Sequence, residues 1–262
     1  PASTHKSFEQ LPDTGELARR AFELNIEYSF EAVAEEDSTQ RYLLARTASQ
    51  MPTGTVAIAH HQTAGQGRLS RTWQTRPGEG LMFSVALRPP HLLSVPLLAG
   101  VATATALRQW CSVVALKWPN DLVVETPDGL RKLGGIVASV HPEDPTLAIV
   151  GIGINFVFDG VAPTDVAIAL TDLVEDLPSR EAVLIELLDH IDRLQRTDVT
   201  NLEGLYRALS LTVGRRVRVH TVDGQIVEGN ADDVSSAGVH VVDDMGLLRI
   251  FSSADVEHLR TS

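Results

Sequence analysis

The sequence predicts an α+β fold, in which helices cover a mixed β-sheet and a small all-β unit follows. Apolar strand-like runs outnumber the long helical patterns between them, which argues against a doubly wound parallel sheet. Long helical patterns occur at 97–111 and 183–194. Beyond residue 210 the sequence changes to short alternating runs separated by turn signals, which is typical of a small β-barrel.

The elements of the larger part are predicted in chain order. The segment Asp13-Thr-Gly-Glu16 is a capping-box-like start for a short helix in an N-terminal extension, residues 1–28. Alternation over 30–34 suggests a strand, and Asp37-Ser38-Thr39 then starts a helix over 39–48. Further strands are expected at 55–60, 81–87, 113–118, 122–124, 135–140 and 146–157, with the Ala-rich helix 97–111 among them.

Two regions complete the predicted organisation. The amphipathic pattern over 183–194 opens after Pro178-Ser179, and its apolar stripe is expected to face the core. We therefore expect one domain over 29–210 and a barrel of about five short strands over 211–262.

Composition bounds the class of protein. The chain is 44% apolar with charges of both signs, so it is too apolar to be disordered. Its longest uncharged apolar stretches are 11 and 12 residues, short of the roughly 20 that a membrane-spanning helix needs, and no secretory signal is visible. Cys111 is the single cysteine, which excludes an intramolecular disulfide. We expect a cytoplasmic globular protein with no membrane partner.

The charge distribution indicates where an anion could bind. A formal charge of −12 argues against a nucleic-acid-coating surface. Residues 61–132, however, hold 8 basic and 4 acidic side chains, a local excess of +4. This excess is either a chance cluster on a solvated face or a pocket for an anionic substrate. Only Lys6, Lys117 and Lys132 are lysines among 22 cations, so positions that kept lysine are candidates for tasks that arginine cannot perform.

The first of four candidate clusters is a glycine-rich loop, Gln62 to Trp73, which follows a predicted strand. It fails as a dinucleotide fingerprint because Ser70 replaces the third glycine and no helix pattern follows. Its glycines, together with Arg68 and Arg71, suit a flexible loop that wraps an anion. An ordinary surface loop is the alternative.

The other three clusters are short and lie on or beside predicted strands. The run Lys117-Trp-Pro-Asn-Asp121 ends a strand, where α/β sites tend to form. The run Arg131–Ile136 places Lys132 and a glycine pair at the start of a buried strand, although a hairpin would explain the turn before it. The run Val150–Asn155 is an apolar strand with two glycines and a lone asparagine, and close strand packing is its alternative reading.

In this order and at these spacings the four clusters resemble the catalytic domain of biotin protein ligases, which attach biotin to a carboxylase subunit. In that family they read as a Gly-Arg-Gly-Arg loop ending in Arg-x-x-Trp or Arg-x-Trp, then Lys-Trp-Pro-Asn-Asp, Lys-Leu-Ala-Gly-Ile and Gly-x-Gly-Ile-Asn. The resemblance covers residues 29 to about 260, including a terminal SH3-like β-barrel. It implies that biotin and MgATP give biotinyl-5′-AMP, and that a lysine of a biotin carboxyl carrier domain then takes the biotin.

The resemblance also implies a role for each matching residue. It assigns catalysis to Lys132, Arg68 and Asp121, with Asp121 as the Mg²⁺ ligand. It assigns biotin binding to Ser38, Thr39, Gln40, Gln62, Gly65, Gln66, Gly67, Arg68, Lys132 and Gly135. It assigns ATP binding to Arg68, Arg71, Trp73, Lys117, Asn120, Lys132 and Asn155.

Three departures from the family pattern matter: Gln66 replaces the second loop arginine, Ser70 a common glycine and Gln40 the usual asparagine, whereas Gly134 for alanine is a small change. Two other functions remain as alternatives. A lipoate-type ligase shares the scaffold but has different motifs. A biotin-dependent repressor needs a DNA-binding module, and residues 1–28, with 3 cations and 5 acids, offer no room for one. We expect a monofunctional ligase, monomeric or weakly dimeric, that binds no DNA.

Overall fold

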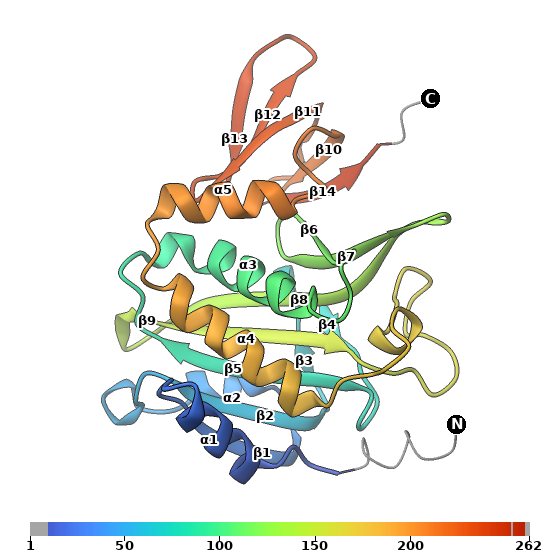
Figure 1. Ribbon diagram of the computed structural model, residues 1–262. Coiled ribbons are helices and arrows are strands. Elements are labelled where there is room, and N and C mark those ends of the chain that lie inside the picture. Colours follow the sequence, from blue (N-terminus) through green and yellow to red (C-terminus); the bar gives the residue numbers. More distant parts are fainter. Residues whose placement is uncertain (1–9, 253, 260–262) are drawn as a thin grey trace.

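The computed structural model describes residues 10–252 and 254–259, and its centre is a seven-stranded mixed β-sheet (Figure 1). The strands are β1 (Ser29–Glu36), β2 (Thr55–Gln62), β5 (Gly80–Leu87), β6 (Ala115–Lys117), β7 (Asp121–Thr126), β8 (Gly129–His141) and β9 (Asp144–Asn155). Their order is β1-β2-β5-β9-β8-β7-β6. The β1–β2 pair is parallel and each other neighbouring pair is antiparallel, so the predicted mixed sheet is confirmed.

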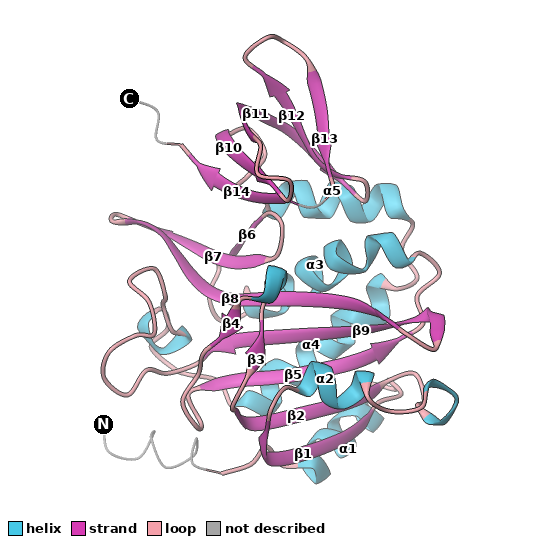
Figure 2. Cartoon of the chain, turned by 180° about the vertical axis from the view of Figure 1, so that it is seen from behind, coloured by secondary structure: helices cyan, strands magenta, loops and turns pink. Residues whose placement is uncertain are grey.

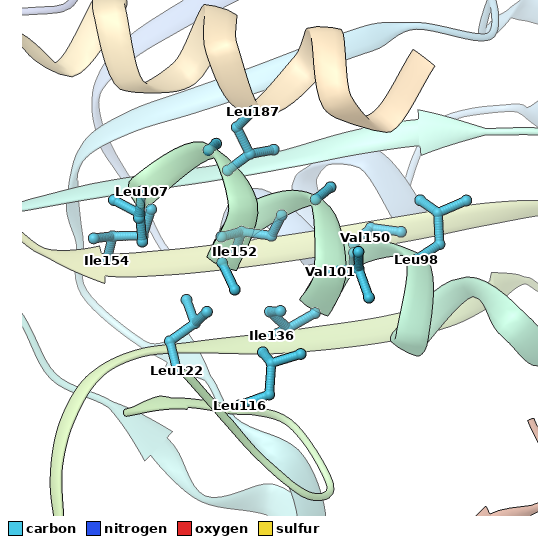
Figure 3. Close-up of a cluster of buried hydrophobic side chains, with 14 of the residues drawn as sticks. Leu98, Val101, Leu107, Leu116, Leu122, Ile136, Val150, Ile152, Ile154 and Leu187 are labelled. Carbon is cyan, nitrogen blue, oxygen red and sulfur yellow. The ribbon is translucent and has the colours of Figure 1, made fainter. Parts of the chain in front are cut away.

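Three helices cover one face of this sheet: α1 (Thr14–Glu23), α3 (Val95–Leu107) and α4 (Arg180–Leu194). Helix α3 is apolar on all sides because it contacts the sheet, α4 and the later helix α5 (Val199–Leu209) at once. Leu98, Val101 and Leu107 of α3 meet sheet residues such as Ile152 in this core, together with Leu187 of α4 (Figure 3). The helix ends at Leu107, four residues before the predicted end.

The other face carries α2 (Thr39–Leu44) and a short hairpin, β3 (Gly65–Gln66) and β4 (Thr72–Trp73), as Figure 2 shows. The helix predicted over 39–48 was too long. Thr47 is in an extended conformation and starts a separate 3-10 turn, because threonine and serine favour caps and turns over helix interiors. The 3-10 turns are η2 (Ala48–Gln50), η3 (Arg68–Ser70), η4 (Leu92–Ser94) and η5 (Leu170–Asp172).

A second sheet follows α5 and consists of five short antiparallel strands, as predicted. The strands are β10 (Arg216–Thr221), β11 (Ile226–Ser235), β12 (Gly238–Asp243), β13 (Leu248–Phe251) and β14 (Ala254–His258). Their hydrogen-bonded order is β13-β12-β11-β10-β14, and α5 lies between this sheet and α3 (Figure 1). Within residues 10–252 and 254–259, the helices are too short or too polar to cross a membrane.

The two-residue period of β9 explains why a site forms opposite the helices. Alternate residues face the helix layer, and they are Ala148, Val150, Ile152 and Ile154. On the other face, Leu147 and Ile149 pack beneath α2. The positions that follow on that face are Gly151, Gly153 and Asn155. The two glycines leave this part of the sheet without side chains of its own, so groups from other elements can approach its backbone closely and form a site there.

Candidate active site

Two adjoining cavities lie on the glycine face of β8 and β9. The first, about 190 Å³, is enclosed by α2, the β3–β4 hairpin, the β6–β7 turn and β14. The second, about 310 Å³, shares Thr72, Trp73 and Lys132 with the first. These shared side chains separate two compartments that together have the size of a small-molecule site.

The cavities collect nearly all of the residues predicted from the sequence. The first is lined by Ser38, Thr39, Gln40, Gln62, Gln66, Gly67, Arg68, Arg71, Trp73, Lys117, Asn120, Asp121, Lys132 and Gly135. Asn155 lines the second. Gly65 lines neither of them, because it is buried against the partner strand of its hairpin, where an added Cβ would come within 2.6 Å of the Trp73 carbonyl oxygen.

One end of the first cavity is a chain of buried polar side chains. Gln62 Oε1 accepts hydrogen bonds from the Thr39 N–H at 2.8 Å and the Thr39 hydroxyl at 3.2 Å. Ser84 Oγ lies 2.9 Å from Thr39 Oγ1 and donates to Gln40 Oε1 at 3.2 Å, while Gln40 Nε2 donates to the Ile149 carbonyl at 2.9 Å. This end is built to form hydrogen bonds with a polar ligand group.

Sequence reasoning missed Ser84, and a signal for it was present. It is a fully buried hydroxyl in the otherwise apolar strand β5. The start of α2 adds a second polar group, because Ser38 occupies the N-cap position but makes no side-chain capping bond. The Ser38 hydroxyl therefore lines the cavity without serving the helix. Gly151 makes room for the Gln40 side chain, since a Cβ there would lie 2.7 Å from Gln40 Oε1.

Lys132 reaches the cavity because of an irregularity in the β7–β8 ladder. Leu122 pairs with Gly134 but Val123 pairs with Lys132, so β8 has one extra residue at this point. Such a bulge reverses the alternation and re-aims a side chain. Lys132 and Gly135 consequently face the same side, where a Cβ on Gly135 would lie 3.5 Å from Lys132 Cε.

The Lys132 side chain meets a carboxylate and an indole. Its Nζ lies 2.5 Å from Asp121 Oδ1 and 5.7 Å from the centre of the Trp73 ring. Its backbone is held from the other side, because its N–H donates to the Val166 carbonyl at 2.6 Å. Asn155 Nδ2 donates to the Lys132 carbonyl at 3.2 Å. Lys132 is thus fixed through both its main chain and its ammonium group.

Trp73 forms the wall between the compartments by lying flat on the glycines. A Cβ on Gly153 would lie 2.8 Å from Trp73 Cε2, and one on Gly135 would lie 3.3 Å from Trp73 Cζ3. The Trp73 Nε1–H is buried and has no hydrogen-bond partner in the described part of the chain. A buried donor of this kind is usually satisfied, so a ligand or water acceptor is expected beside it.

The mouth of the first cavity lies between the glycine-rich loop and β14. Arg71 forms an ion pair with Asp255, and Arg68 Nη1 donates to the Ala254 carbonyl at 3.3 Å. Burial lowers the pKa of Arg68, although an arginine still carries its charge at neutral pH. These contacts bring the C-terminal sheet to the site, which the sequence did not predict.

The β6–β7 turn places further polar groups at the cavity wall. Lys117 pairs with Asp121 in the ladder. Asn120 Nδ2 donates to the Ile136 carbonyl at 2.9 Å, and the Ile136 N–H donates back to the Asn120 carbonyl at 2.9 Å. Asn120 therefore ties the turn to β8.

The described residues contain no group of three or more His, Cys, Asp or Glu side chains that would hold a metal ion by themselves. Asp121 is a carboxylate within the first cavity, and Asp255 lies at its mouth. Magnesium is commonly held by one or two carboxylates together with substrate phosphates and water. The donors present suit such a shared ion.

Comparison with known proteins gives a consistent result. Residues 33–155 match the biotin/lipoate A/B protein ligase family. A biotin–[acetyl-CoA-carboxylase] ligase from Mycobacterium tuberculosis is 35% identical over 249 residues, which cover 88% of this chain and 89% of that protein. The bifunctional ligase/repressor BirA of Bacillus subtilis is 29% identical over 84% of this chain and 71% of that protein.

The fold gives the same relationship. The structure of biotin protein ligase from Aquifex aeolicus in complex with biotin and ATP aligns with a TM-score of 0.75 at 25% identity, over 88% of this chain and 99% of that chain. The sequence match covers 89% of the Mycobacterium tuberculosis ligase, and the structural match covers 99% of the Aquifex aeolicus ligase. The chain belongs to the biotin/lipoate A/B protein ligase family and, within it, to the biotin protein ligases.

Proposed function

We propose that the protein joins biotin and ATP to form biotinyl-5′-AMP and pyrophosphate, and then transfers the biotinyl group to one lysine of a biotin carboxyl carrier domain. The observation that carries this proposal is the two-compartment site with Lys132 on the shared wall. A condensation of two substrates requires that their reacting groups meet at one point. The position of Lys132 suits that point.

The first step joins two anions, and the cations of the site offset their repulsion. A biotin carboxylate oxygen attacks the α-phosphorus of ATP, the bond to the bridging oxygen breaks, and pyrophosphate leaves with that electron pair. Lys132, Arg68, Arg71 and Lys117 all line the first cavity. Fixed cations that face the growing charge lower the barrier without any reorganisation during the reaction.

The second step needs access for an amine. The uncharged ε-amine of the acceptor lysine attacks the acyl carbon, the bond from that carbon to the phosphate oxygen breaks, and AMP leaves while the amine loses a proton to water or phosphate. Asp121 lies 2.5 Å from Lys132 Nζ and faces the same cavity. The ion pair holds the Lys132 ammonium group at a fixed place beside the reacting groups.

Asp121 is the residue that would hold Mg²⁺ with the ATP phosphates, and the ion would supply additional neutralisation of phosphate charge. Asp121 would then be shared between the ion and Lys132. This assignment is supported by the carboxylate in the cavity.

The polar end of the first cavity favours biotin over lipoate. Ser38, Thr39, Gln62 and Ser84 offer hydroxyl and amide groups that suit the ureido ring of biotin. The dithiolane ring of lipoate carries no N–H or C=O group to match them, so lipoate would gain fewer hydrogen bonds at this end. A lipoate-type ligase is therefore the weaker alternative.

Mass spectrometry of a biotin carboxyl carrier domain tests the proposal directly. After incubation with the protein, ATP, Mg²⁺ and biotin, we expect a mass gain of one biotinyl group on one lysine. No gain with biotin, or an equal gain when lipoate replaces biotin, would contradict the assignment. A cytoplasmic location and a monomeric or weakly dimeric state stay predictions, and fractionation and sedimentation measure them.

A further inference from the structure

The edge of β6 is important for the site because β6 leads into the cavity-lining segment Lys117–Asp121. β6 is the last strand of the large sheet, and β7 pairs with only one of its sides. An edge strand otherwise exposes unpaired N–H and C=O groups on its second side. The position of Lys117–Asp121 therefore depends on what holds that second side.

The chain that enters the C-terminal sheet covers this edge. The Leu211 N–H donates to the Leu116 carbonyl at 2.8 Å, and Ser210 forms a parallel bridge with Leu116. One residue further on, Thr212 Oγ1 accepts the Trp118 N–H at 2.9 Å. Thr212 is fully buried. Residues 210–212 thus act as a short extra strand of the large sheet.

The last strand of the C-terminal sheet contacts the same hydroxyl. His258 Nε2 lies 3.1 Å from Thr212 Oγ1. Burial, with Lys117 and Arg215 nearby, lowers the pKa of His258 to about 4, so its imidazole is neutral at physiological pH. Because the Thr212 oxygen already accepts the Trp118 N–H, we assign its proton to a bond with Nε2.

We propose that Thr212 and His258 are positioning residues for the ligase reaction: they fix the Trp118 N–H and thereby hold the Lys117–Asp121 segment at the cavity. The C-terminal sheet then serves adenylate formation through a hydrogen-bond chain from Trp118 to Thr212 to His258. This inference rests on the proposed function.

The geometry predicts which kinetic constant depends on the hydrogen bonds from Trp118 to Thr212 to His258. The Trp118 N–H is one residue from Lys117 and three from Asp121, whose carboxylate meets Lys132. Without the Thr212 hydroxyl, a buried N–H loses its partner and the segment must move to find another. The polar end of the cavity, on α2 and β5, is built from other elements. Loss of the Thr212 hydroxyl should therefore raise the KM for ATP and leave the dissociation constant of biotin almost unchanged.

Steady-state pyrophosphate release by the full chain, at saturating biotin, is the test. For Thr212→Val, which keeps the shape and removes the hydroxyl, we expect the KM for ATP to rise about tenfold. The dissociation constant of biotin should change by less than about twofold. Thr212→Ser keeps the hydroxyl and should restore wild-type values.

Variants of His258 provide a second, independent test, which remains available if Thr212→Val does not fold. His258→Leu should raise the KM for ATP, and His258→Gln, whose side-chain oxygen can accept the same proton, should restore much of it. Because His258 acts through Thr212, the double variant Thr212→Val/His258→Leu should be no worse than Thr212→Val alone.

Val241→Ala is the matched control. Val241 is buried in β12, away from β6, so this variant should lower the melting temperature and leave the KM for ATP unchanged. Equal KM values for wild type and folded Thr212→Val, or an equal rise in Val241→Ala, would overturn the inference. If the wild-type chain itself releases no pyrophosphate with biotin and ATP, the proposed function fails instead.

Discussion

Lys132 combines three constraints that no other described lysine meets. The β8 bulge aims it into the cavity, Asp121 pairs with its ammonium group, and the Trp73 ring lies 5.7 Å from its Nζ. A lysine under such constraint loses little conformational freedom when substrates bind. In this arginine-rich sequence, lysine here supplies a compact point charge in place of a planar guanidinium.

We predict that Lys132→Gln lowers the rate of adenylate formation at least about 100-fold, on the order of 3 kcal/mol, because its charge acts mainly in the transition state. Lys132→Arg should also be poor. Pyrophosphate release measures the effect, and Arg88→Gln, which removes a cation paired with Asp144 outside both cavities, is the control. Near-wild-type release from a folded Lys132→Gln protein would contradict the role.

Gln66 is the departure from the family pattern whose effect can be measured most directly. It is exposed on β3 and lines the first cavity, where it pairs with Thr72 of β4, the residue that follows Arg71. Arg76, a possible replacement for the missing charge, lies in neither cavity and pairs with Glu79. Of these two arginines, Arg71 is the one placed to compensate.

We predict that Gln66→Arg slows dissociation of biotinyl-5′-AMP about 5- to 150-fold, the effect of roughly 1 to 3 kcal/mol from one charge-assisted hydrogen bond in a closed site. Gln66→Ala tells whether the glutamine amide already contacts the intermediate, since dissociation should then become faster. Stopped-flow or filter-binding measurement of release provides the rate. Rates for wild type and Gln66→Arg that agree within about twofold would mean that this position is neutral.

Among the structural elements, the β3–β4 hairpin is short, with two residues in each strand. Gly65 pairs with Trp73 and Gln66 with Thr72, and the Gly67 N–H donates to the Arg71 carbonyl at 2.7 Å. Leu69 at its tip has a φ of 52° and is half exposed, which is unfavourable for a leucine. Elements with few pairs and exposed apolar residues open most easily. The Arg71–Asp255 ion pair is one restraint on this loop when no ligand is bound, beside the hydrogen bond from Arg68 to the Ala254 carbonyl.

We predict that biotin and ATP, both at saturating concentration, protect the loop from trypsin at Arg68 and Arg71, because contacts with the bound ligands order the closed loop. Asp255→Asn should speed cleavage in the absence of ligand and change it less in the ligand complex. Gel or mass analysis of the fragments over time gives both rates. Identical cleavage with and without ligands would argue against an ordering loop.

Sequence reasoning located the strands of the large sheet because their apolar runs are long enough to show a period. It missed α5, although Leu202, Tyr206 and Leu209 have helical spacing and Asp198 caps the first turn. The sequence could not predict the bulge at Lys132 or the contacts of residues 210–212 with β6. Both are long-range pairings that leave no local pattern.

The sequence predicted the residues of the candidate site more completely than it predicted the details of the fold around the site. Glycines, lysines and tryptophan in unusual strand positions already marked the cavity. Ser84 was overlooked because one serine in an apolar strand is common, and Thr212 and His258 because they act only through the assembled domain junction. Sequence patterns identify residues that face a ligand better than residues that support them.

At the scale of the whole molecule, the two explanations of the basic segment 61–132 can now be separated. Half of its cations line the first cavity: Arg68, Arg71, Lys117 and Lys132. Three others pair with carboxylates, in Arg76–Glu79, Arg88–Asp144 and Arg131–Asp128. The excess therefore lies mostly inside the site, which supports the anion-pocket explanation over a chance surface cluster.

The same arrangement predicts that this chain does not bind DNA specifically. Binding to a duplex requires clustered cations that replace phosphate counterions. In this protein of charge −12, half of the cations of the basic segment line the first cavity, and exposed arginines such as Arg19, Arg193 and Arg196 form ion pairs with carboxylates. The chain also matches only 71% of the Bacillus subtilis ligase/repressor, so that relative has further sequence outside the shared part.

Fluorescence anisotropy with an operator-like palindromic duplex, with and without biotin and ATP, is the measurement. We expect no saturable binding from about 50 to 200 mM salt, a range over which specific complexes typically lose affinity steeply. Sequence-selective retention that weakens with salt in this range would overturn the prediction.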